Sequence, residues 1–336
     1  VADDALAQIL FTSGTTGAAK AAAVSHASLV GHTLAVARTV GLGADDVVLG
    51  ALPLTHSFGC RMVMLLALAA GARVVLMRRF DAARALALLD AEAVTFWPAV
   101  PTMLAAVCAV AGPPPRALEW VLSAGAPLAD ALCRRAEARL GCDVRQGYGL
   151  TEASFSTIDA PAAPRVIGSV GRPVEGVEVR IAKGGEIEVR GPHRMVGYLD
   201  DAAATAAAFD DGGWLRTGDV GRFDADGRLW VVDRTKDLII RGGNNVYPSE
   251  VEAALAAHPA VAEVAVVGRP DDYYGEEVVA VVVARADQAV TADELTLFLR
   301  ARVAATKVPR EYAFVDALPL GPSQKVLKRA LRQRLV

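Results

Sequence analysis

The sequence predicts an α/β protein: a large core of parallel or mixed sheet with a small β subdomain, followed by a small α+β C-terminal domain. Three observations lead to this class. In the first two thirds of the 336 residues, short apolar runs alternate with Ala- and Leu-rich helical stretches. From Ile167 onward, short β-type pieces are separated by Gly, Asp and Pro. Beyond Asp233 the pattern changes again to a compact helix and strand unit with apolar faces of its own.

The elements are expected in the following order. Short apolar runs indicate buried strands, and longer Ala/Leu-rich runs indicate helices. In the core we expect strands at 7–11, 47–52, 73–77 and 94–97, and helices at 28–40, 62–70 and 82–89. In the β subdomain we expect strands at 177–181, 186–189 and 229–232. The last unit follows as helix 249–257, strands 261–267 and 278–284, helix 292–303 and strand 312–315, so we expect domains of residues 1–233 and 234–336.

Composition excludes several classes of protein. Apolar residues make up 53% of the chain, and the net charge is -3, whereas a nucleic-acid binder normally carries a basic excess. No apolar run reaches the roughly 18–20 residues of a membrane span, and the longest, 62–72, ends at Arg73. The four cysteines form no CxxC pair, so we expect buried free thiols, no zinc site and a reducing cytoplasmic location.

The strongest chemical signal is the segment 11–20, Phe-Thr-Ser-Gly-Thr-Thr-Gly-Ala-Ala-Lys. Here a strand expected to be buried runs into hydroxyl side chains, two glycines and Lys20. Backbone amides and hydroxyls of such a loop donate to phosphate oxygens, and the lysine adds a positive charge. The Walker A pattern GxxxxGK[ST] is absent. An ordinary polar loop is the alternative.

A second cluster is the segment 146–152, Gln-Gly-Tyr-Gly-Leu-Thr-Glu. Its two glycines permit close approach of the backbone to a flat ring. Thr151 can donate to a phosphate, and Glu152 is a hard oxygen ligand suited to Mg²⁺. The alternative is that Thr151 and Glu152 form the N-cap of a helix.

Three further segments carry charged groups in turns. Asp219, which follows a glycine turn, could accept from a ribose diol, and the alternative is a type I turn with an Asx cap. The charged run 233–237 could alternatively be a solvated end of a strand. Lys325 lies in a Pro- and Gly-bounded loop before a basic helix, and a surface lysine is the alternative there.

In this order and spacing, the five segments resemble the adenylate-forming superfamily of acyl- and aryl-CoA ligases, luciferases and peptide-synthetase adenylation domains. The segment 52–59, Leu-Pro-Leu-Thr-His-Ser-Phe-Gly, resembles the acyl-pocket motif of that family, and 123–128, Ser-Ala-Gly-Ala-Pro-Leu, resembles its adenine-side loop. The resemblance covers nearly the whole chain. It implies ATP, Mg²⁺ and coenzyme A, or a carrier-protein phosphopantetheine, as cofactors.

The resemblance also implies roles in nucleotide binding. The β- and γ-phosphates would be wrapped by Thr12, Ser13, Gly14, Thr15, Thr16, Gly17 and Lys20. The adenine would be bordered by Ala126, Gln146, Gly147 and Tyr148. Thr151 would hold the α-phosphate and Glu152 the Mg²⁺ ion, while Asp219 and Arg234 would bind the ribose hydroxyls.

Other roles concern the acid, the thiol and domain motion. Lys325 matches the lysine that bridges carboxylate and α-phosphate, and Lys236 matches the hinge of the C-terminal domain. Gly242 and Gly243 match the pantetheine path. His56 would form a gate or wall of the acid pocket, and a satisfied core histidine is the alternative.

The implied activity is ATP-dependent conversion of a carboxylic acid to an acyl-adenylate with release of pyrophosphate, then thioester formation with coenzyme A. The segments 233–252 and 322–332 resemble CoA ligases more than peptide synthetases. Small or apolar pocket candidates favour a fatty or aryl acid over a dicarboxylate: Trp97, Ala99, Val100, Ala124 and Gly125. Arg61 is the one nearby charge that could alter this. The alternatives are an acyl-AMP ligase that loads an acyl carrier protein and a degenerate nucleotide-binding remnant.

The sequence also departs from the family pattern. Ala19 and Ala21 stand where the family usually has Pro and Gly, and Gln324 stands where it has Gly, which could slow loop or domain motion. Relatives usually carry a further subdomain before the phosphate loop. A sheet cut at this point would expose an apolar edge, so we expect self-association or a partner on that side.

Overall fold

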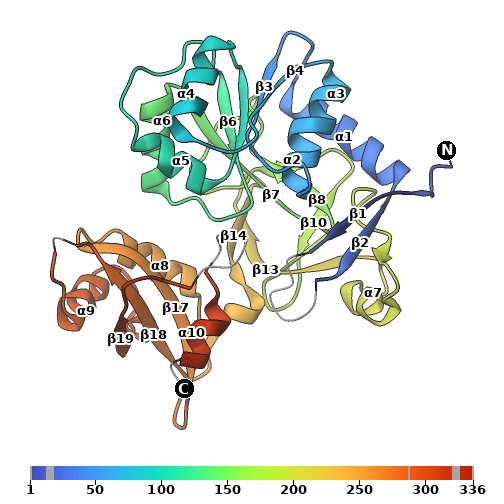
Figure 1. Ribbon diagram of the computed structural model, residues 1–336. Helices are drawn as coiled ribbons and strands as arrows, with labels where there is room; N and C mark the ends of the chain where they lie inside the picture. The colour runs from blue at the N-terminus through green and yellow to red at the C-terminus, as the bar shows by residue number, and fades with distance from the viewer. Residues whose placement is uncertain (1, 13–18, 287, 320–325, 335–336) are drawn as a thin grey trace. The chain divides into compact units, whose positions relative to one another are not determined.

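The computed structural model describes residues 2–12, 19–286, 288–319 and 326–334 (Figure 1). The chain forms two compact units. The first comprises Val1–Thr217 and Gly221–Val231, and the second comprises Gly218–Val220 and Val232–Val336. Each unit has hydrophobic cores of its own.

A seven-stranded sheet in the order β4-β3-β5-β6-β7-β8-β9 forms the centre of the first unit. Its first five strands are parallel: β4 (Arg73–Leu76), β3 (Val47–Gly50), β5 (Phe96–Ala99), β6 (Trp120–Ser123) and β7 (Asp143–Leu150). β8 (Ser154–Ile158) and β9 (Arg172–Pro173) continue it antiparallel. Parallel strands are covered on both faces, which explains why β3, β5 and β6 are fully buried apolar runs.

Two groups of helices lie on opposite sides of this sheet (Figure 1). One group contains α4 (Ala82–Ala91), α5 (Pro101–Cys108) and α6 (Asp130–Leu140), and the other contains α1 (His26–Val40), α2 (Ser57–Gly59) and α3 (Leu66–Ala70). The helix expected at 62–70 is more complex than predicted, because a π-helical segment, η1 (Cys60–Leu65), joins α2 to α3. Apolar periodicity gives no warning of such a widened turn.

Two smaller sheets complete the first unit. The three-stranded sheet pairs β1 (Leu6–Phe11), β2 (Ala21–Ser25) and β12 (Gly197–Tyr198), and α7 (Ala202–Ala208) follows β12. The expectation that β1 is buried is wrong: it is an edge strand in which only Leu10 is buried, and Phe11 is 73% exposed. Self-association or a partner at this edge stays a prediction. The other sheet has the order β10 (Glu178–Ile181), β11 (Glu186–Arg190), β13 (Leu215–Phe223) and β14 (Leu229–Arg234).

The second unit is built on a five-stranded sheet. Its path is β16 (Asn244–Val246), β15 (Ile239–Arg241), β18 (Gly275–Ala284) and β17 (Val261–Asp271), and β19 (Glu311–Phe314) pairs parallel with β18. Its helices are α8 (Pro248–Ala256), α9 (Ala292–Arg300) and α10 (Lys328–Arg334), with short 3₁₀ turns η2 (Thr235–Asp237) and η3 (Ala305–Lys307). The expected order of helix, two strands, helix and strand is confirmed, although α9 ends three residues earlier than predicted.

The structure also bears on cysteines and membrane spans. All four cysteines are free; Cys60 and Cys133 are buried, while Cys108 and Cys142 are partly buried. Within the described ranges, no helix has both the length and the apolar character needed to cross a bilayer.

Candidate active site

Thr12 and Lys20 lie opposite each other where β1 and β2 join. The Thr12 amide donates to the Lys20 carbonyl oxygen at 2.8 Å, and the Lys20 amide donates to Thr12 Oγ1 at 3.3 Å. The predicted phosphate loop is therefore the connection of a β-hairpin. Its other predicted residues lie outside the described part of the chain: Ser13, Gly14, Thr15, Thr16 and Gly17.

The structure brings Lys20 and Glu152 to one phenol ring. Lys20 Nζ lies 4.9 Å from the centre of the Tyr198 ring, a cation–π geometry. The Tyr198 hydroxyl donates to Glu152 Oε1 at 2.9 Å. Burial, together with the nearby Glu152 charge, raises the pKa of the Tyr198 phenol, so it remains a donor at neutral pH. A lysine directly before β2, a tyrosine on β12 and a carboxylate after β7 thus form one cluster.

Tyr198 is the residue that sequence reasoning missed. It lies on β12, where it pairs with Ala22 of β2, and this pairing carries the phenol to the base of the predicted phosphate loop. The only local signal is a glycine-tyrosine pair, Gly197-Tyr198, at the end of a short apolar run. Such a pair is too common to identify a site without the strand pairing.

Thr151 and Glu152 occupy a turn between β7 and β8, so the expectation that they could cap a helix is wrong. The Glu152 backbone is fixed because its carbonyl oxygen accepts from the Met195 amide at 2.6 Å. Among the described residues, no group of three acidic, His or Cys side chains could hold a metal ion. Mg²⁺ in ATP-dependent enzymes is typically bound by one or two carboxylates together with substrate phosphates and water, so a single carboxylate fits this ion.

Gln146, Gly147 and Tyr148 lie on β7 and are buried. Gly147 and Gly149 serve the pairing with β8. A β-carbon at Gly149 would lie 2.0 Å from the Ser154 carbonyl oxygen, and one at Gly147 would lie 2.6 Å from the Phe155 ring. These glycines are therefore required by the neighbouring strand, a reason different from the predicted approach to a flat ligand ring.

Three of the candidate nucleotide residues lie at one edge of the seven-stranded sheet. Ala126 is exposed on the loop after β6, and Thr151 and Glu152 follow β7, the next parallel strand. Ligands of open α/β sheets bind at the carboxyl ends of the parallel strands. The three residues follow such ends.

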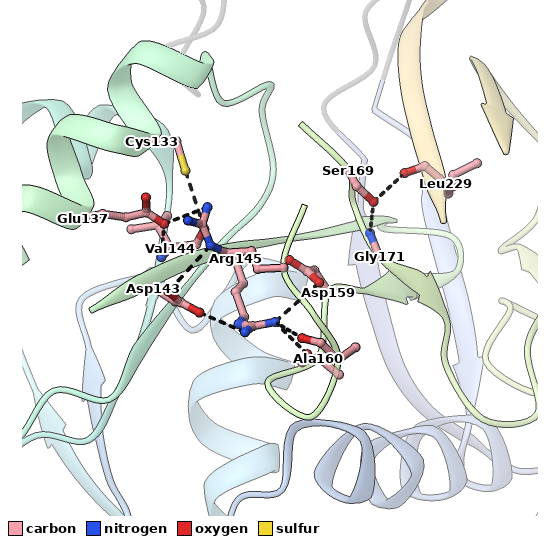
Figure 2. A network of polar contacts seen from close by, with 12 residues as sticks. Cys133, Glu137, Asp143, Val144, Arg145, Asp159, Ala160, Ser169, Gly171 and Leu229 are labelled. Carbon is pink, nitrogen blue, oxygen red and sulfur yellow. Dashed lines mark hydrogen bonds and ion pairs between the residues drawn. The ribbon is translucent and has the colours of Figure 1, made fainter. Parts of the chain in front are cut away.

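A buried ion network holds β7 in place directly before Gln146 (Figure 2). The Arg145 guanidinium contacts Asp143 at 2.9 Å and Asp159 at 3.5 Å, and it donates to the Ala160 carbonyl oxygen at 2.8 Å. Burial raises the pKa of Asp159 to about 6 against the opposing effect of Arg145. The Asp159 amide also donates to the Gln146 carbonyl oxygen at 2.8 Å, so the network supports the strand that leads to the site.

The candidate acid pocket begins at the N-terminus of α2. His56 is exposed, and its Nδ1 accepts from the Phe58 amide at 3.2 Å, so the alternative of a core histidine is wrong. A β-carbon added at Gly125 would lie 3.7 Å from Val100 Cγ1 and 4.0 Å from Phe58 Cδ1. Phe58, Val100 and Gly125 therefore meet at one small apolar corner. The neighbouring candidates Trp97, Ala99 and Ala124 are buried.

Asp219 and Arg234 lie on the parts of β13 and β14 that belong to the second unit, and they form an ion pair with Arg234 Nε 3.1 Å from Asp219 Oδ1. Asp219 is buried within β13, so the alternative of a turn with an Asx cap is wrong, and Arg234 ends β14. Two residues later, Lys236 lies in η2, where burial lowers its pKa and the Arg234 charge adds to the effect. Arg332 of α10 contacts the next residue, Asp237, at 3.3 Å. Lys325 lies outside the described residues.

Gly242 and Gly243 form the two-residue turn of the β15–β16 hairpin. Their φ angles of 55° and 78° are those of a turn that favours glycine at both positions. A β-carbon at Gly242 would also lie 3.0 Å from the Tyr274 ring. The conformation of the turn thus explains why both positions are glycine. The pantetheine path expected along Gly242 and Gly243 stays a prediction.

A basic pocket that the sequence analysis missed lies next to this turn. It has a volume of about 330 Å³ and is lined by Arg241, Thr296, Arg300, Ala305, Val308, Pro309 and Arg310. One buried carboxylate, Glu277, faces two of the arginines, with Arg241 Nε at 2.6 Å and Arg310 Nη1 at 3.6 Å. Asp271 also interacts with the charge of Arg310, so three guanidinium groups face two carboxylates and leave the pocket with an excess of positive charge.

Family models match both parts of the chain. A model described as AMP-binding enzyme matches residues 1–199, and one described as AMP-binding enzyme C-terminal domain matches residues 250–325.

Two curated relatives illustrate the similarity. A 3-[(3aS,4S,7aS)-7a-methyl-1,5-dioxo-octahydro-1H-inden-4-yl]propanoyl:CoA ligase of Rhodococcus jostii is 40% identical over 99% of this chain and 66% of its own length. A feruloyl-CoA synthase of an Amycolatopsis species is 39% identical over 98% of this chain and 70% of its own. The chain thus spans about two thirds of the length of the curated relatives it matches.

Solved structures agree with these matches. ATP-bound MatB from Rhodopseudomonas palustris superposes with a TM-score of 0.94 at 33% identity, covering 99% of this chain and 69% of that one. The o-succinylbenzoate CoA synthetase MenE from Bacillus subtilis, in complex with the acyl-adenylate intermediate, gives a TM-score of 0.91 at 35% identity, covering 98% and 70%.

Proposed function

Because the chain belongs to the family of AMP-binding, adenylate-forming enzymes, we propose that it activates a carboxylic acid with ATP and transfers the acyl group to coenzyme A. The family membership and the α/β fold confirm the predictions from sequence. The relatives are named as CoA ligases and CoA synthases, which supports the acid–thiol ligase class and its cofactors ATP, Mg²⁺ and coenzyme A.

The observation that carries the proposal is the Lys20–Tyr198–Glu152 cluster. A cation over the ring of one phenol and a carboxylate at its hydroxyl suit a triphosphate, whose oxygens need positive charge and a divalent ion. When bound, Mg²⁺ neutralises charge that develops on the phosphates during displacement. We propose that Lys20 binds phosphate oxygens and that Tyr198 orients the Glu152 carboxylate through their 2.9 Å hydrogen bond.

In the first half-reaction a carboxylate oxygen attacks the α-phosphorus, and the bond to pyrophosphate breaks. Both reactants are anionic, so cations must offset their repulsion. The resemblance gives this role to Lys325, and Thr151 is proposed to hold the α-phosphate. Asp219 and Arg234 are proposed to bind the ribose, and their 3.1 Å ion pair supports this by holding the carboxylate in one orientation.

In the second half-reaction the thiol of coenzyme A attacks the acyl carbon, and AMP leaves. We propose Lys236 as the hinge residue for the change between half-reactions, with Gly242 and Gly243 along the pantetheine path. The basic pocket beside this turn supports coenzyme A as the acceptor, because its phosphates match the unbalanced positive charge of the pocket. The four free thiols support the proposal of a reducing cytoplasmic location.

The test is carboxylate-dependent ATP–pyrophosphate exchange across fatty, aryl and dicarboxylic acids, followed by thioester formation with three acceptors. Coenzyme A, dephospho-coenzyme A and a holo acyl carrier protein are compared. We expect exchange with one acid class and thioester formation with coenzyme A. If only the carrier protein is acylated, the acceptor is the carrier protein and not coenzyme A. A thermal shift with ATP but no exchange with any acid would identify a nucleotide-binding remnant.

Two variants separate the half-reactions. Lys325→Ala should abolish most adenylation while thioester formation from supplied acyl-adenylate continues. Substitution of Lys236 should slow the second half-reaction more than the first. Equal loss of both half-reactions in the Lys325 variant, or an unchanged ratio of the two rates in the Lys236 variant, would contradict the respective role.

A further inference from the structure

Arg61 is a buried cation without a partner. It lies in the π-helical segment η1, is only 4% exposed, and none of its three guanidinium nitrogens has a hydrogen-bond partner. No ion pair to it is formed by any residue in the described ranges. Burial lowers its pKa to about 10, so it remains charged at neutral pH.

The surroundings of Arg61 supply polar groups and no negative charge. The chamber around it is lined by His32, Thr33, Val36, Met62, Leu66 and Ser154, and it is closed, with no space for a water molecule. The hydroxyl of Ser154 is buried without a partner. His32 Nε2 lies 2.8 Å from the Phe155 carbonyl oxygen, and the His193 ring stacks on His32 at 5.5 Å. Burial lowers the pKa of His32 to about 4 and that of His193 to about 3, so both rings are neutral near pH 7.

A guanidinium in such a place requires an anion. A buried unpaired charge is strongly destabilising, and proteins normally pair it or bind a ligand with it. Arg61 offers planar N–H donors, and Ser154 adds a hydroxyl donor in the same chamber. This donor set matches a carboxylate, which accepts two parallel hydrogen bonds from one guanidinium.

The chamber is linked to the candidate acid pocket through neighbouring residues. Phe58, three residues before Arg61 in the chain, contributes to the apolar corner at Gly125. The Phe58 ring lies 5.3 Å from the Phe155 ring, and Ser154, the neighbour of Phe155, lines the Arg61 chamber. The Phe58 and Phe155 rings therefore connect the apolar corner to residues next to the chamber.

We propose that the acid activated by this protein carries a second carboxylate, and that Arg61 binds this distal group. The inference rests on the proposed function and refines its substrate class: the small apolar walls hold the body of the acid, and Arg61 selects dicarboxylic acids over monocarboxylic ones. Because the chamber is closed, binding of the second carboxylate requires the side chains around Arg61 to move apart.

The test uses acids matched in size that differ in one charge. Malonic, succinic, glutaric and homophthalic acids are each compared with their monomethyl ester in ATP–pyrophosphate exchange. We expect the preferred diacid to exceed its ester in kcat/KM by at least about 30-fold, the lower end for a buried charge pair. Arg61→Gln should remove this preference through the KM of the diacid, leaving the ester unchanged or improved. Arg84→Gln, on the exposed face of α4, is the matched control.

Two further readouts separate this inference from folding and from the proposed function. Arg61→Met should keep or raise the melting temperature, because it removes the unpaired charge and keeps the volume. Calorimetric binding of the diacid to the unmodified protein and to Arg61→Gln decides the point even without turnover. Equal activity with diacid and ester, an equal loss of both in Arg61→Gln, or unaltered diacid binding to that variant would overturn the inference. Absence of exchange with every acid would instead contradict the proposed function.

Discussion

Removal of the Tyr198 hydroxyl, in Tyr198→Phe, should weaken the use of Mg²⁺ and ATP without disturbing the fold. The phenol donates to Glu152 at 2.9 Å, and the ring lies beside the Lys20 ammonium. Phenylalanine keeps the ring and its interaction with Lys20, so only the hydrogen bond to the carboxylate is lost.

The magnitude follows from the kind of hydrogen bond. A hydrogen bond to a charged group contributes about 1.5–3 kcal/mol, and the partial exposure of Tyr198 favours the lower end of that range. About 1.5 kcal/mol corresponds to roughly a tenfold change in affinity. Loss of a residue that orients a metal ligand typically costs 10–100-fold in metal affinity or activity, which agrees with this value.

The assay is ATP–pyrophosphate exchange at fixed acid and ATP, with Mg²⁺ varied. We expect the half-saturating Mg²⁺ concentration to rise about tenfold in Tyr198→Phe. Tyr198→Leu, which also removes the aromatic ring beside Lys20, should in addition raise the KM for ATP. An unchanged Mg²⁺ dependence in Tyr198→Phe would refute the orienting role of the phenol. Identical kinetics of the two variants would show that the hydroxyl alone matters.

Three other predictions concern stability and nucleotide binding. Gly149→Ala places a β-carbon 2.0 Å from a carbonyl oxygen of β8 and should cost at least about 2 kcal/mol in urea unfolding, whereas the control Gly31→Ala, in open space on α1, should cost nothing. The free energy of unfolding should fall by on the order of 3 kcal/mol as the pH drops from 6.5 toward 4, because of His32. Its ring binds a proton in the unfolded chain over this range, whereas the folded ring, with a pKa of about 4, does not. His32→Gln should flatten that part of the unfolding profile, and an equal slope in both proteins would contradict the assignment. Asp219→Asn and Arg234→Gln should each raise the KM for ATP about tenfold. Because the two residues act as one ion pair, the KM of the double variant should be little higher than that of either single variant. Fully additive effects on the KM would contradict a joint role of the pair.

Many of the helices and strands can be predicted from short segments of the sequence. Buried parallel strands appear as continuous apolar runs, and the strands observed at Val47–Gly50 and Phe96–Ala99 lie within or beside the predicted ranges. The amphipathic pattern and the Thr291 capping box likewise mark α9. These features depend on neighbouring residues only, so a sequence without any structure is enough to find them.

The reasons for individual residues were less accessible. Gly149 was expected to make room for a ligand ring, yet it makes room for the β8 backbone. β1 was expected to be buried, yet it is an edge strand with Phe11 largely exposed. The contact of Gly149 and the edge position of β1 are both set by strand pairing, which no local pattern identifies.

The sequence by itself determined the family, the element order and most of the candidate residues, because motif spacing and apolar periodicity are local properties of the chain. Only the tertiary structure decided which side chains meet. Tyr198 reaches Glu152 and Lys20 because β12 pairs with β2 across more than a hundred residues. Arg61 is isolated because a π-helical turn places it among α1 and β8 side chains that carry no negative charge. Long-range strand pairing and helix packing set such contacts, and their energies come from burial and complementary charge that no short segment contains.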